Sequence, residues 1–405
     1  MAELVFTDLS FQEKEDTIVI TLLKLFEIVV DKAELERIAP ITIQQNSITF
    51  AKISEKTAAN KFNRILAFNI EKLKHKLTQR PSLYIHRYSG IPLIGVRYIG
   101  IADKGSNLLE VKPMTSCNIA CTFCSVDEGP GSKKRMDYVI EEAYLAAEVK
   151  RLLDFKQCKD MHIYINPHGE PTLYPRLVEL IADLTAISWV KHISIITNGS
   201  LLTERFIDEL IAAGLTHLNL SLNAVTPEKA VELAGTKAYN VEKAMQRARY
   251  AAKSKKLKVI LAPVWVHGVN DGEIGKIIRF AKEIGADVGI QKYSYNARGR
   301  NPVKEKTWEY FEQQLKQWEK QYGLSLLQKG KIEKTKELPK PMQKGETITA
   351  TIVWEGRGAA EKLCMAKGRL IEVHEVPAGM SRKEIRVKLT EDTHNIFTGV
   401  YHGKR

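Results

Sequence analysis

The sequence predicts an α/β protein whose central part carries parallel β-strands between a mixed N-terminal region and a small antiparallel β-domain. Three observations support this fold class. Short apolar runs alternate six times with amphipathic helical segments over residues 108–323. The pattern before residue 105 is mixed, and period-two alternation follows residue 344. We therefore expect an accessory domain at 1–105, a core at 106–325, a Lys/Pro-rich linker at 326–343 and a β-barrel at 344–405.

The composition is that of a soluble globular protein. A chain of 405 residues favours two or three domains, and 44% hydrophobic with 27% charged residues excludes disordered, collagenous and disulfide-scaffold classes. No apolar run approaches the roughly 18 residues of a membrane span, and the N-terminus lacks a secretion signal. We expect a cytoplasmic protein with no membrane contact. The net charge of +13 favours an anionic partner.

The accessory domain gives little chemical information. The apolar run Ile18 to Val30 predicts a buried helix, and Ser82 to Ile101 carries β-branched and aromatic residues suited to strands. This region has no cysteine, Gly-rich loop or catalytic arrangement.

The core pattern predicts six strand–helix units. One helix is expected between a cap at Thr203 and Gly214, and another between Asp271 and Gly285. Six strand–helix units imply a parallel sheet, and right-handed crossovers make it either a doubly wound sheet or a partial barrel; periodicity leaves both open. The expected strands are Leu108–Val111, Ile163–Asn166, Ile193–Thr197, Leu218–Leu222, Val259–Val266 and Val288–Gln291.

The central chemical signal is a group of three cysteines, Cys117, Cys121 and Cys124, on the loop that leaves the first core strand. Three thiolates at this spacing can hold three irons of a cubane cluster and leave the fourth open to a substrate or cofactor. Zinc is the alternative, but it requires a fourth ligand from elsewhere, such as Asp127 or a distant histidine.

The motif C-x3-C-x2-C at the end of the first core strand, with Phe123 before the third cysteine, resembles the radical S-adenosylmethionine (SAM) superfamily, in its archaeal-type Fe–S oxidoreductase form. Further landmarks of that family recur in order after later strands. They are His168-Gly169-Glu170-Pro171, Thr197-Asn198-Gly199, Ser221-Leu222-Asn223-Ala224, and Pro263-Val264-Trp265-Val266 with Gly268-Val269-Asn270-Asp271. The resemblance covers roughly residues 108–300.

This resemblance implies a partial (βα)6, TIM-like barrel that binds a [4Fe-4S] cluster and SAM. In the family, a reduced cluster cleaves SAM to a 5′-deoxyadenosyl radical that takes hydrogen from the substrate, which requires a ferredoxin- or flavodoxin-like reductant as partner. The three cysteines would hold the cluster. SAM contacts are expected from Phe123, Gly169, Glu170, Pro171, Thr197, Asn198, Ser221, Asn223, Val264 and Val266.

His168 stands where the family often has glycine. It is a candidate catalytic residue, and a purely local hydrogen-bonding role is the alternative.

The C-terminal segment is similar to a TRAM domain, a small oligonucleotide-binding-like barrel appended to RNA-modifying enzymes. This similarity covers about 60 residues, and the alternative is a barrel that only buttresses the core. With basic runs beside the cysteine loop and after the sixth strand, it predicts RNA as a partner. The candidate RNA contacts are Lys133, Lys134, Arg135, Arg298, Arg300, Arg357, Arg386 and Lys388.

The leading hypothesis is a radical SAM enzyme that modifies RNA, specifically tRNA. Two alternatives stay open: a radical SAM enzyme acting on a small metabolite or peptide, and a non-catalytic Fe–S or zinc RNA-binding protein.

Overall fold

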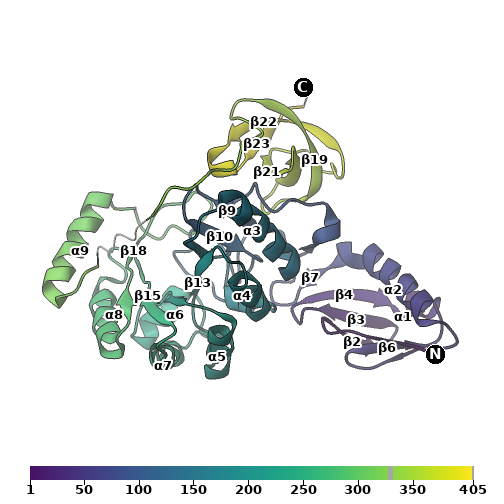
Figure 1. Cartoon of the computed structure of the whole chain (residues 1–405), viewed down its shortest axis with the longest axis horizontal. Coiled ribbons are helices and arrows are strands. Elements are labelled where there is room, and N and C mark those ends of the chain that lie inside the picture. Colours follow the sequence, from purple (N-terminus) through teal and green to yellow (C-terminus); the bar gives the residue numbers. More distant parts are fainter. Residues whose placement is uncertain (327–331, 404–405) are drawn as a thin grey trace.

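The computed structural model describes residues 1–326 and 332–403. Figure 1 shows a central α/β core with the N-terminal sheets at one end and the C-terminal barrel standing on another side. The expected linker falls partly on residues 327–331, which lie outside the described residues. Residues 332–343 of the expected linker are mostly exposed. They run along the core, because the Thr335 backbone N–H donates to the carbonyl of Gly105 at 3.0 Å.

The N-terminal region consists of two antiparallel sheets with helices α1 (Lys32–Glu36) and α2 (Glu55–Asn69) and the 3-10 turn η1 (Ile70–Lys72). Phe62 of α2 packs its ring against Phe6, Phe11 and Phe50. One sheet has the order β2 (Leu9–Lys14), β3 (Thr17–Leu22), β4 (Phe26–Asp31), β7 (Lys74–His75). The other has the order β1 (Ala2–Val5), β6 (Ser47–Phe50), β5 (Ile41–Ile43).

The buried helix expected at Ile18 to Val30 is wrong, because this segment forms the β3–β4 hairpin. Ile18 and Ile20 are fully buried on one face, which is the period of a strand. The turn uses Leu23 and Lys24 at φ of 51° and 60°. Neither residue is a Gly, Asn or Asp, so the usual sequence signal for a turn is missing.

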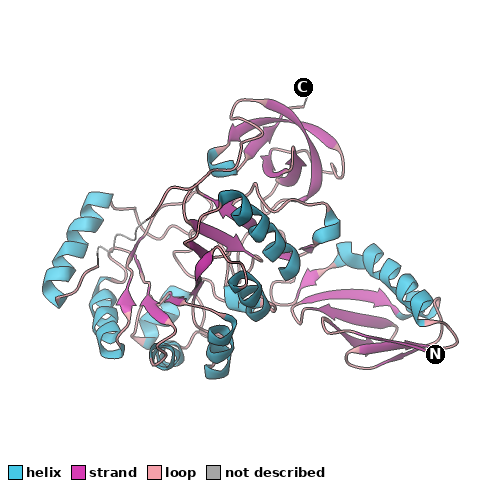
Figure 2. Ribbon diagram, in the orientation of Figure 1, coloured by secondary structure: helices cyan, strands magenta, loops and turns pink. Residues whose placement is uncertain are grey.

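The core is a partial barrel. Its parallel strands lie side by side in chain order, without the reversal that a doubly wound sheet requires. Right-handed crossovers therefore put the covering helices on one face of the sheet (Figures 1 and 2). The parallel strands are β10 (Leu108–Lys112), β12 (Met161–Ile165), β13 (Val190–Thr197), β14 (His217–Leu220), β15 (Lys258–Leu261) and β17 (Asp287–Val288), and β9 (Gly100–Asp103) pairs antiparallel with β10.

The core helices follow the predicted pattern. The Thr203 hydroxyl caps α5 by accepting from the Phe206 N–H, and Gly214 ends that helix; Gly285 likewise ends α8. The helices are α3 (Glu142–Lys156), α4 (Leu177–Thr185), α5 (Glu204–Ala213), α6 (Pro227–Ala234), α7 (Val241–Ala252), α8 (Asp271–Ile284) and α9 (Trp308–Tyr322), with the 3-10 turns η2 (Arg87–Ser89) and η3 (Pro171–Leu173).

The last two predicted core strands are each interrupted. Beyond β15 and β17, the chain continues as the short parallel pair β16 (Val264–Trp265) and β18 (Gln291–Lys292). Pro263, which has no N–H to donate to a ladder, separates β15 from β16. A second short parallel pair, β8 (Ser82–Ile85) and β11 (Asp137–Ile140), connects the lead-in segment to the core.

The C-terminal region is a closed barrel with strand order β19-β20-β21-β23-β22. Ile385, Val387 and Leu389 are buried, while Arg386 and Lys388 between them are exposed, as the alternation predicts. The barrel strands are β19 (Thr347–Glu355), β20 (Lys362–Ala366), β21 (Arg369–His374), β22 (Glu384–Glu391) and β23 (Thr398–Tyr401), with the 3-10 turn η4 (Thr393–Asn395). Among the described residues, no helix combines the length and apolar character needed to cross a bilayer.

Candidate active site between the core and the barrel

The loop between β10 and β11 carries the three cysteines, and all three line one cavity of about 330 Å³. We call this space the cluster cavity. It lies at the carboxyl ends of the parallel strands, where such folds gather their functional loops. The expected SAM-binding residues that line it are Phe123, Gly169, Glu170, Thr197, Asn198, Ser221, Asn223 and Val264.

Two expected SAM contacts, Pro171 and Val266, do not line the cluster cavity. Pro171 begins the turn η3. Val266 is fully buried, and its N–H donates to the Asn270 side chain at 2.8 Å. Neither residue lines the cavity, so the structure does not bring them together with the others.

The cysteine loop lies very close to the β12 strand end. Ser116 and Gly169 form a bridge, and Gly169 has a φ of 148°. A Cβ atom on Gly169 would come 1.8 Å from the Ser116 carbonyl oxygen. Only glycine permits this approach. Gly235 at the end of α6 has the same role on the other side of the loop, where a Cβ would lie 2.1 Å from the Ala120 carbonyl oxygen.

Glu170 joins the ends of β12 and β13. Its Oε1 accepts hydrogen bonds from the Thr172 N–H at 3.0 Å, the Thr172 hydroxyl at 2.5 Å and the Thr197 hydroxyl at 2.5 Å. Its Oε2 accepts from the Asn198 N–H at 2.8 Å. Burial raises the pKa of this carboxyl, and these hydrogen bonds oppose the shift. A carboxylate has about four acceptor positions, so Oε2 retains capacity for a donor in the cavity.

Asn270 organises the β14 and β15 ends, a role that the sequence analysis did not assign to it. This residue is 1% exposed, and its amide donates to the carbonyls of Asn223 and Val264, both at 3.0 Å. The Asn223 side chain in turn accepts from the Val264 N–H at 2.8 Å. It lies in the landmark Gly268-Val269-Asn270-Asp271, directly before α8, although no individual role was expected of Asn270.

The cysteines fit a metal cluster. None of the three is in a disulfide. Burial raises the pKa of the Cys121 thiol to about 12, and burial also raises the pKa of the Cys117 thiol well above its usual value. Three partly buried thiols line this one cavity, and iron would supply the positive charge that stabilises neighbouring thiolates.

Arg300, expected as an RNA contact, supports the cysteine loop in this structure. Its backbone N–H donates to the Cys124 carbonyl at 2.8 Å, and its guanidinium donates to the Cys121 carbonyl at 3.1 Å. Its Nε donates to the Asp127 carboxylate at 2.9 Å, and its Nη2 donates to the Glu128 carbonyl at 3.0 Å. Each nitrogen of the guanidinium therefore makes one hydrogen bond that holds the cysteine loop.

A second cavity of about 440 Å³ lies between the core and the barrel. We call it the interface chamber. It shares Ser125 and Val126 with the cluster cavity. Its other core residues are Arg97, Tyr98, Lys134, His168, Asn296, Ala297 and Arg298, and its barrel residues are Arg357, Glu361, Glu372, His374, Thr390, Glu391 and Thr398.

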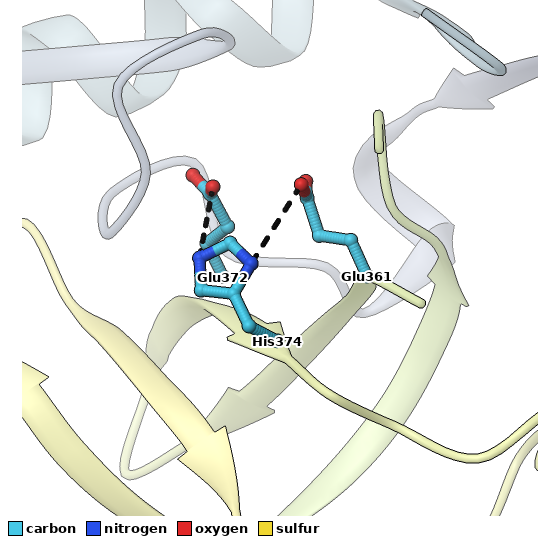
Figure 3. A group of neighbouring side chains, drawn as sticks. All are labelled: Glu361, Glu372 and His374. Atoms are coloured by element: carbon cyan, nitrogen blue, oxygen red, sulfur yellow. Dashed lines mark ion pairs between the residues drawn. The ribbon is translucent and has the colours of Figure 1, made fainter. Parts of the chain in front are cut away.

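Three barrel residues form an acidic group in this chamber. Glu361, Glu372 and His374 place one oxygen or nitrogen atom each within 4.8 Å of one another, and Figure 3 shows the imidazole between the two carboxylates. The Arg298 guanidinium from the core makes an ion pair with Glu372 and lies 2.9 Å from His374 Nε2. This cation balances the buried carboxylates and connects the core to the barrel.

Arg357, another expected RNA contact, is buried at the same interface and lines the interface chamber. It is 3% exposed. Its Nη2 lies 2.5 Å from Glu128 Oε1 and 3.7 Å from Asp137 Oδ1, both on the core. Glu128 is itself joined to the cysteine loop, because its backbone N–H lies 3.4 Å from Cys124 Sγ.

The remaining basic candidates divide into two groups. Lys134 lines the interface chamber, as does Arg298. Lys133, Arg135, Arg386 and Lys388 are exposed and line neither cavity. His168 also lines the chamber, next to Gly169 of the cluster cavity, and therefore lies where the two spaces meet.

Comparison with known proteins gives matches to the core and to the whole chain. The profile of the Radical SAM superfamily matches residues 111–281. An uncharacterized protein of Methanocaldococcus jannaschii is 31% identical over 418 residues, which cover 95% of this chain and 95% of that protein. The GTP 3′,8-cyclase of Chlorobaculum tepidum is 28% identical over 176 residues, 43% of this chain and 50% of the cyclase. The chain thus spans about half the length of that cyclase.

Solved structures match at low identity. The structure of TYW1 with a lysine-pyruvate adduct bound has a TM-score of 0.40 and 18% identity, over 56% of this chain and 80% of that one. Streptococcus suis SuiB bound to the precursor peptide SuiA has a TM-score of 0.41 and 16% identity, over 80% and 71% of the two chains.

Proposed function

Because the chain belongs to the radical SAM superfamily, whose members use a [4Fe-4S] cluster and SAM, we propose that it modifies a tRNA. The nucleotide that is modified would lie in the interface chamber. When bound, the reduced cluster supplies the electron that cleaves SAM and so generates the radical that takes a hydrogen atom from the substrate. A ferredoxin- or flavodoxin-like protein would supply that electron.

The observation that carries this proposal is the side of the barrel that lines the chamber. Small five-stranded barrels of the oligonucleotide-binding type bind through the face of their second and third strands and the loops after strands one and four. In this barrel those strands are β20 and β21, and β21 contributes Glu372 and His374 to the chamber. The loop after β19 contributes Arg357 and Glu361, and the end of β22 contributes Thr390.

An exposed basic stripe leads toward the same chamber. Arg386 and Lys388 point outward on β22, two residues apart, and Thr390 follows at the chamber wall. At about 3.3 Å per residue, the stripe extends roughly 13 Å from Thr390. It would hold backbone phosphates next to a nucleotide in the chamber.

The test combines catalysis with binding. We expect mass spectrometry of tRNA nucleosides to reveal one modified nucleoside that is lost in cells without this protein. The double variant Arg386→Ala, Lys388→Ala should weaken RNA binding and reduce the slope of log K against log salt by about 1.4, since each phosphate contact on single-stranded RNA contributes about 0.7.

A matched control carries the same loss of charge elsewhere. Lys255 and Lys256 are exposed just before β15, at the opposite end of the sheet. Lys255→Ala, Lys256→Ala should leave the slope nearly unchanged. Unaltered nucleosides in the deletion strain, together with equal slopes for the two double variants, would refute an RNA substrate.

The second candidate is a free nucleotide. The chamber volume of about 440 Å³ suits one nucleotide rather than a longer segment. The GTP 3′,8-cyclases act, by their name, on a free nucleotide, and the one from Chlorobaculum tepidum is 28% identical to part of this chain. Turnover of a nucleoside triphosphate in the absence of RNA would favour this candidate.

A further inference from the structure

The charges that line the interface chamber are almost all paired within the protein. Arg97 makes an ion pair with Glu391 across the core–barrel boundary. Arg298 makes one with Glu372, and Arg357 makes one with Glu128. These cations are therefore compensated before any ligand enters.

Lys134 is different. Within residues 1–326 and 332–403, its ammonium group has no carboxylate within 4.0 Å and makes no hydrogen bond, although it lines the chamber. Burial and the neighbouring Arg357 lower the pKa of this ammonium, and the more distant Glu128 and Glu361 oppose that shift only in part. An anion in the chamber would stabilise the charged form further.

His168 also lines the chamber on the core side, and its side chain has no partner among the described residues. In the described part of the chain, its ring nitrogens take part in no hydrogen bond or ion pair, while its backbone carbonyl accepts from the Ser116 N–H. Burial, and then the cations Lys112 and Arg357, lower the pKa of this imidazole well below its usual value. The ring is therefore neutral near pH 7 and offers one N–H donor and one acceptor.

We propose that Lys134 and His168 together bind an anionic group of the substrate, the phosphate of a nucleotide, on the core side of the interface chamber. This inference deepens the proposed function, because it rests on a nucleotide as the substrate. Lys134 supplies the charge and His168 a neutral donor. A phosphate there lies beside Ser125 and Val126, the wall shared with the cluster cavity, so the attached nucleoside can extend toward SAM.

The experiment compares uridine 5′-monophosphate with uridine on the full-length protein, by calorimetry with the cluster assembled and with saturating SAM to fill the other cavity. The wild-type protein should bind the monophosphate more tightly. Lys134→Ala should weaken that binding about tenfold or more and leave uridine binding unchanged, because a hydrogen bond to a charged group contributes about 1.5–3 kcal/mol. Lys134→Arg should retain most of the affinity, and His168→Ala should lose a smaller part of it.

Lys159→Ala is the matched control, because Lys159 is exposed just before β12, away from both cavities. An intact cluster absorption spectrum in each variant verifies folding. Equal affinity of the wild-type protein for uridine and its monophosphate, or equal losses in Lys134→Ala and Lys159→Ala, would overturn the inference.

A short RNA in place of the monophosphate separates this inference from the proposed function. Monophosphate binding that depends on Lys134, without RNA binding or modification, would leave the phosphate site intact and refute the RNA substrate. RNA modification that is insensitive to Lys134→Ala would refute the phosphate site and leave the RNA substrate supported.

Discussion

The cluster cavity and the interface chamber share a wall but are assembled differently. The first is formed by loops at consecutive strand ends of one sheet, and hydrogen bonds join these loops: Glu170 accepts from the Asn198 N–H, and Asn270 donates to the Asn223 carbonyl. The second is formed by segments as far apart as Arg97 and Glu391, and its walls are joined by ion pairs. The comparison teaches that the cofactor site belongs to the core alone, whereas the chamber exists only when the barrel is docked.

The largest expected effect tests the core side of this comparison. Cys121→Ala removes one of three cluster ligands and should reduce iron content, the visible absorption of the cluster and SAM cleavage to background. Cys158→Ala, outside both cavities, should retain all three. A Cys121→Ala protein that still cleaves SAM would show that this cysteine is not a cluster ligand.

A smaller effect is expected at the boundary between the core and the barrel. Arg298→Ala leaves Glu372, 3% exposed, and Glu361, 5% exposed, without their guanidinium. Because Arg298 is half exposed, we expect a discounted loss of about 1–2 kcal/mol in the free energy of unfolding, measured with urea. Hydrogen exchange should also increase in β21.

Arg97→Ala is the control for that boundary. It breaks an ion pair whose arginine side chain is 55% exposed, and we expect the free energy of unfolding to fall by about 0.5 kcal/mol or less. Equal losses in the two variants would contradict a special role for the acidic group in docking.

The smallest effect concerns the core alone. His162, His192 and His217 lie on adjacent strands with ring centroids 5.0 to 5.3 Å apart. Burial lowers the pKa of His162 to about 3 and that of His217 to about 4. The unfolded chain, with histidine pKa values near 6.5, therefore binds more protons in acid. Stability should be greatest above about pH 6.5 and decrease as the pH falls from there toward 4.

His162→Gln should make that decrease shallower, as urea midpoints at pH 7 and pH 5 would show. The exposed His402 provides the control, since His402→Gln should leave the pH dependence unchanged. An unchanged slope in the His162→Gln protein would contradict this explanation.

The sequence predicts the cluster cavity better than the chamber for a physical reason. Parallel strands put their carboxyl ends at one edge, so short motifs after each strand locate Cys117, Glu170, Asn198 and Asn223 on one wall. The contacts of Arg300 and Arg357 depend on how distant segments pack, and a basic residue in a loop has the same sequence signature whether it is solvated or buried. The β3–β4 hairpin was missed because its turn uses residues without a turn preference.

The most direct test of the central claim follows a hydrogen atom between the two cavities. The full-length protein is reduced under anaerobic conditions and incubated with SAM and with tRNA from deletion cells grown in heavy water. The mass of the 5′-deoxyadenosine that forms is then measured by mass spectrometry. We predict RNA-dependent product that carries one deuterium. Product that forms at the same rate without RNA and carries no deuterium would contradict an RNA substrate in the interface chamber.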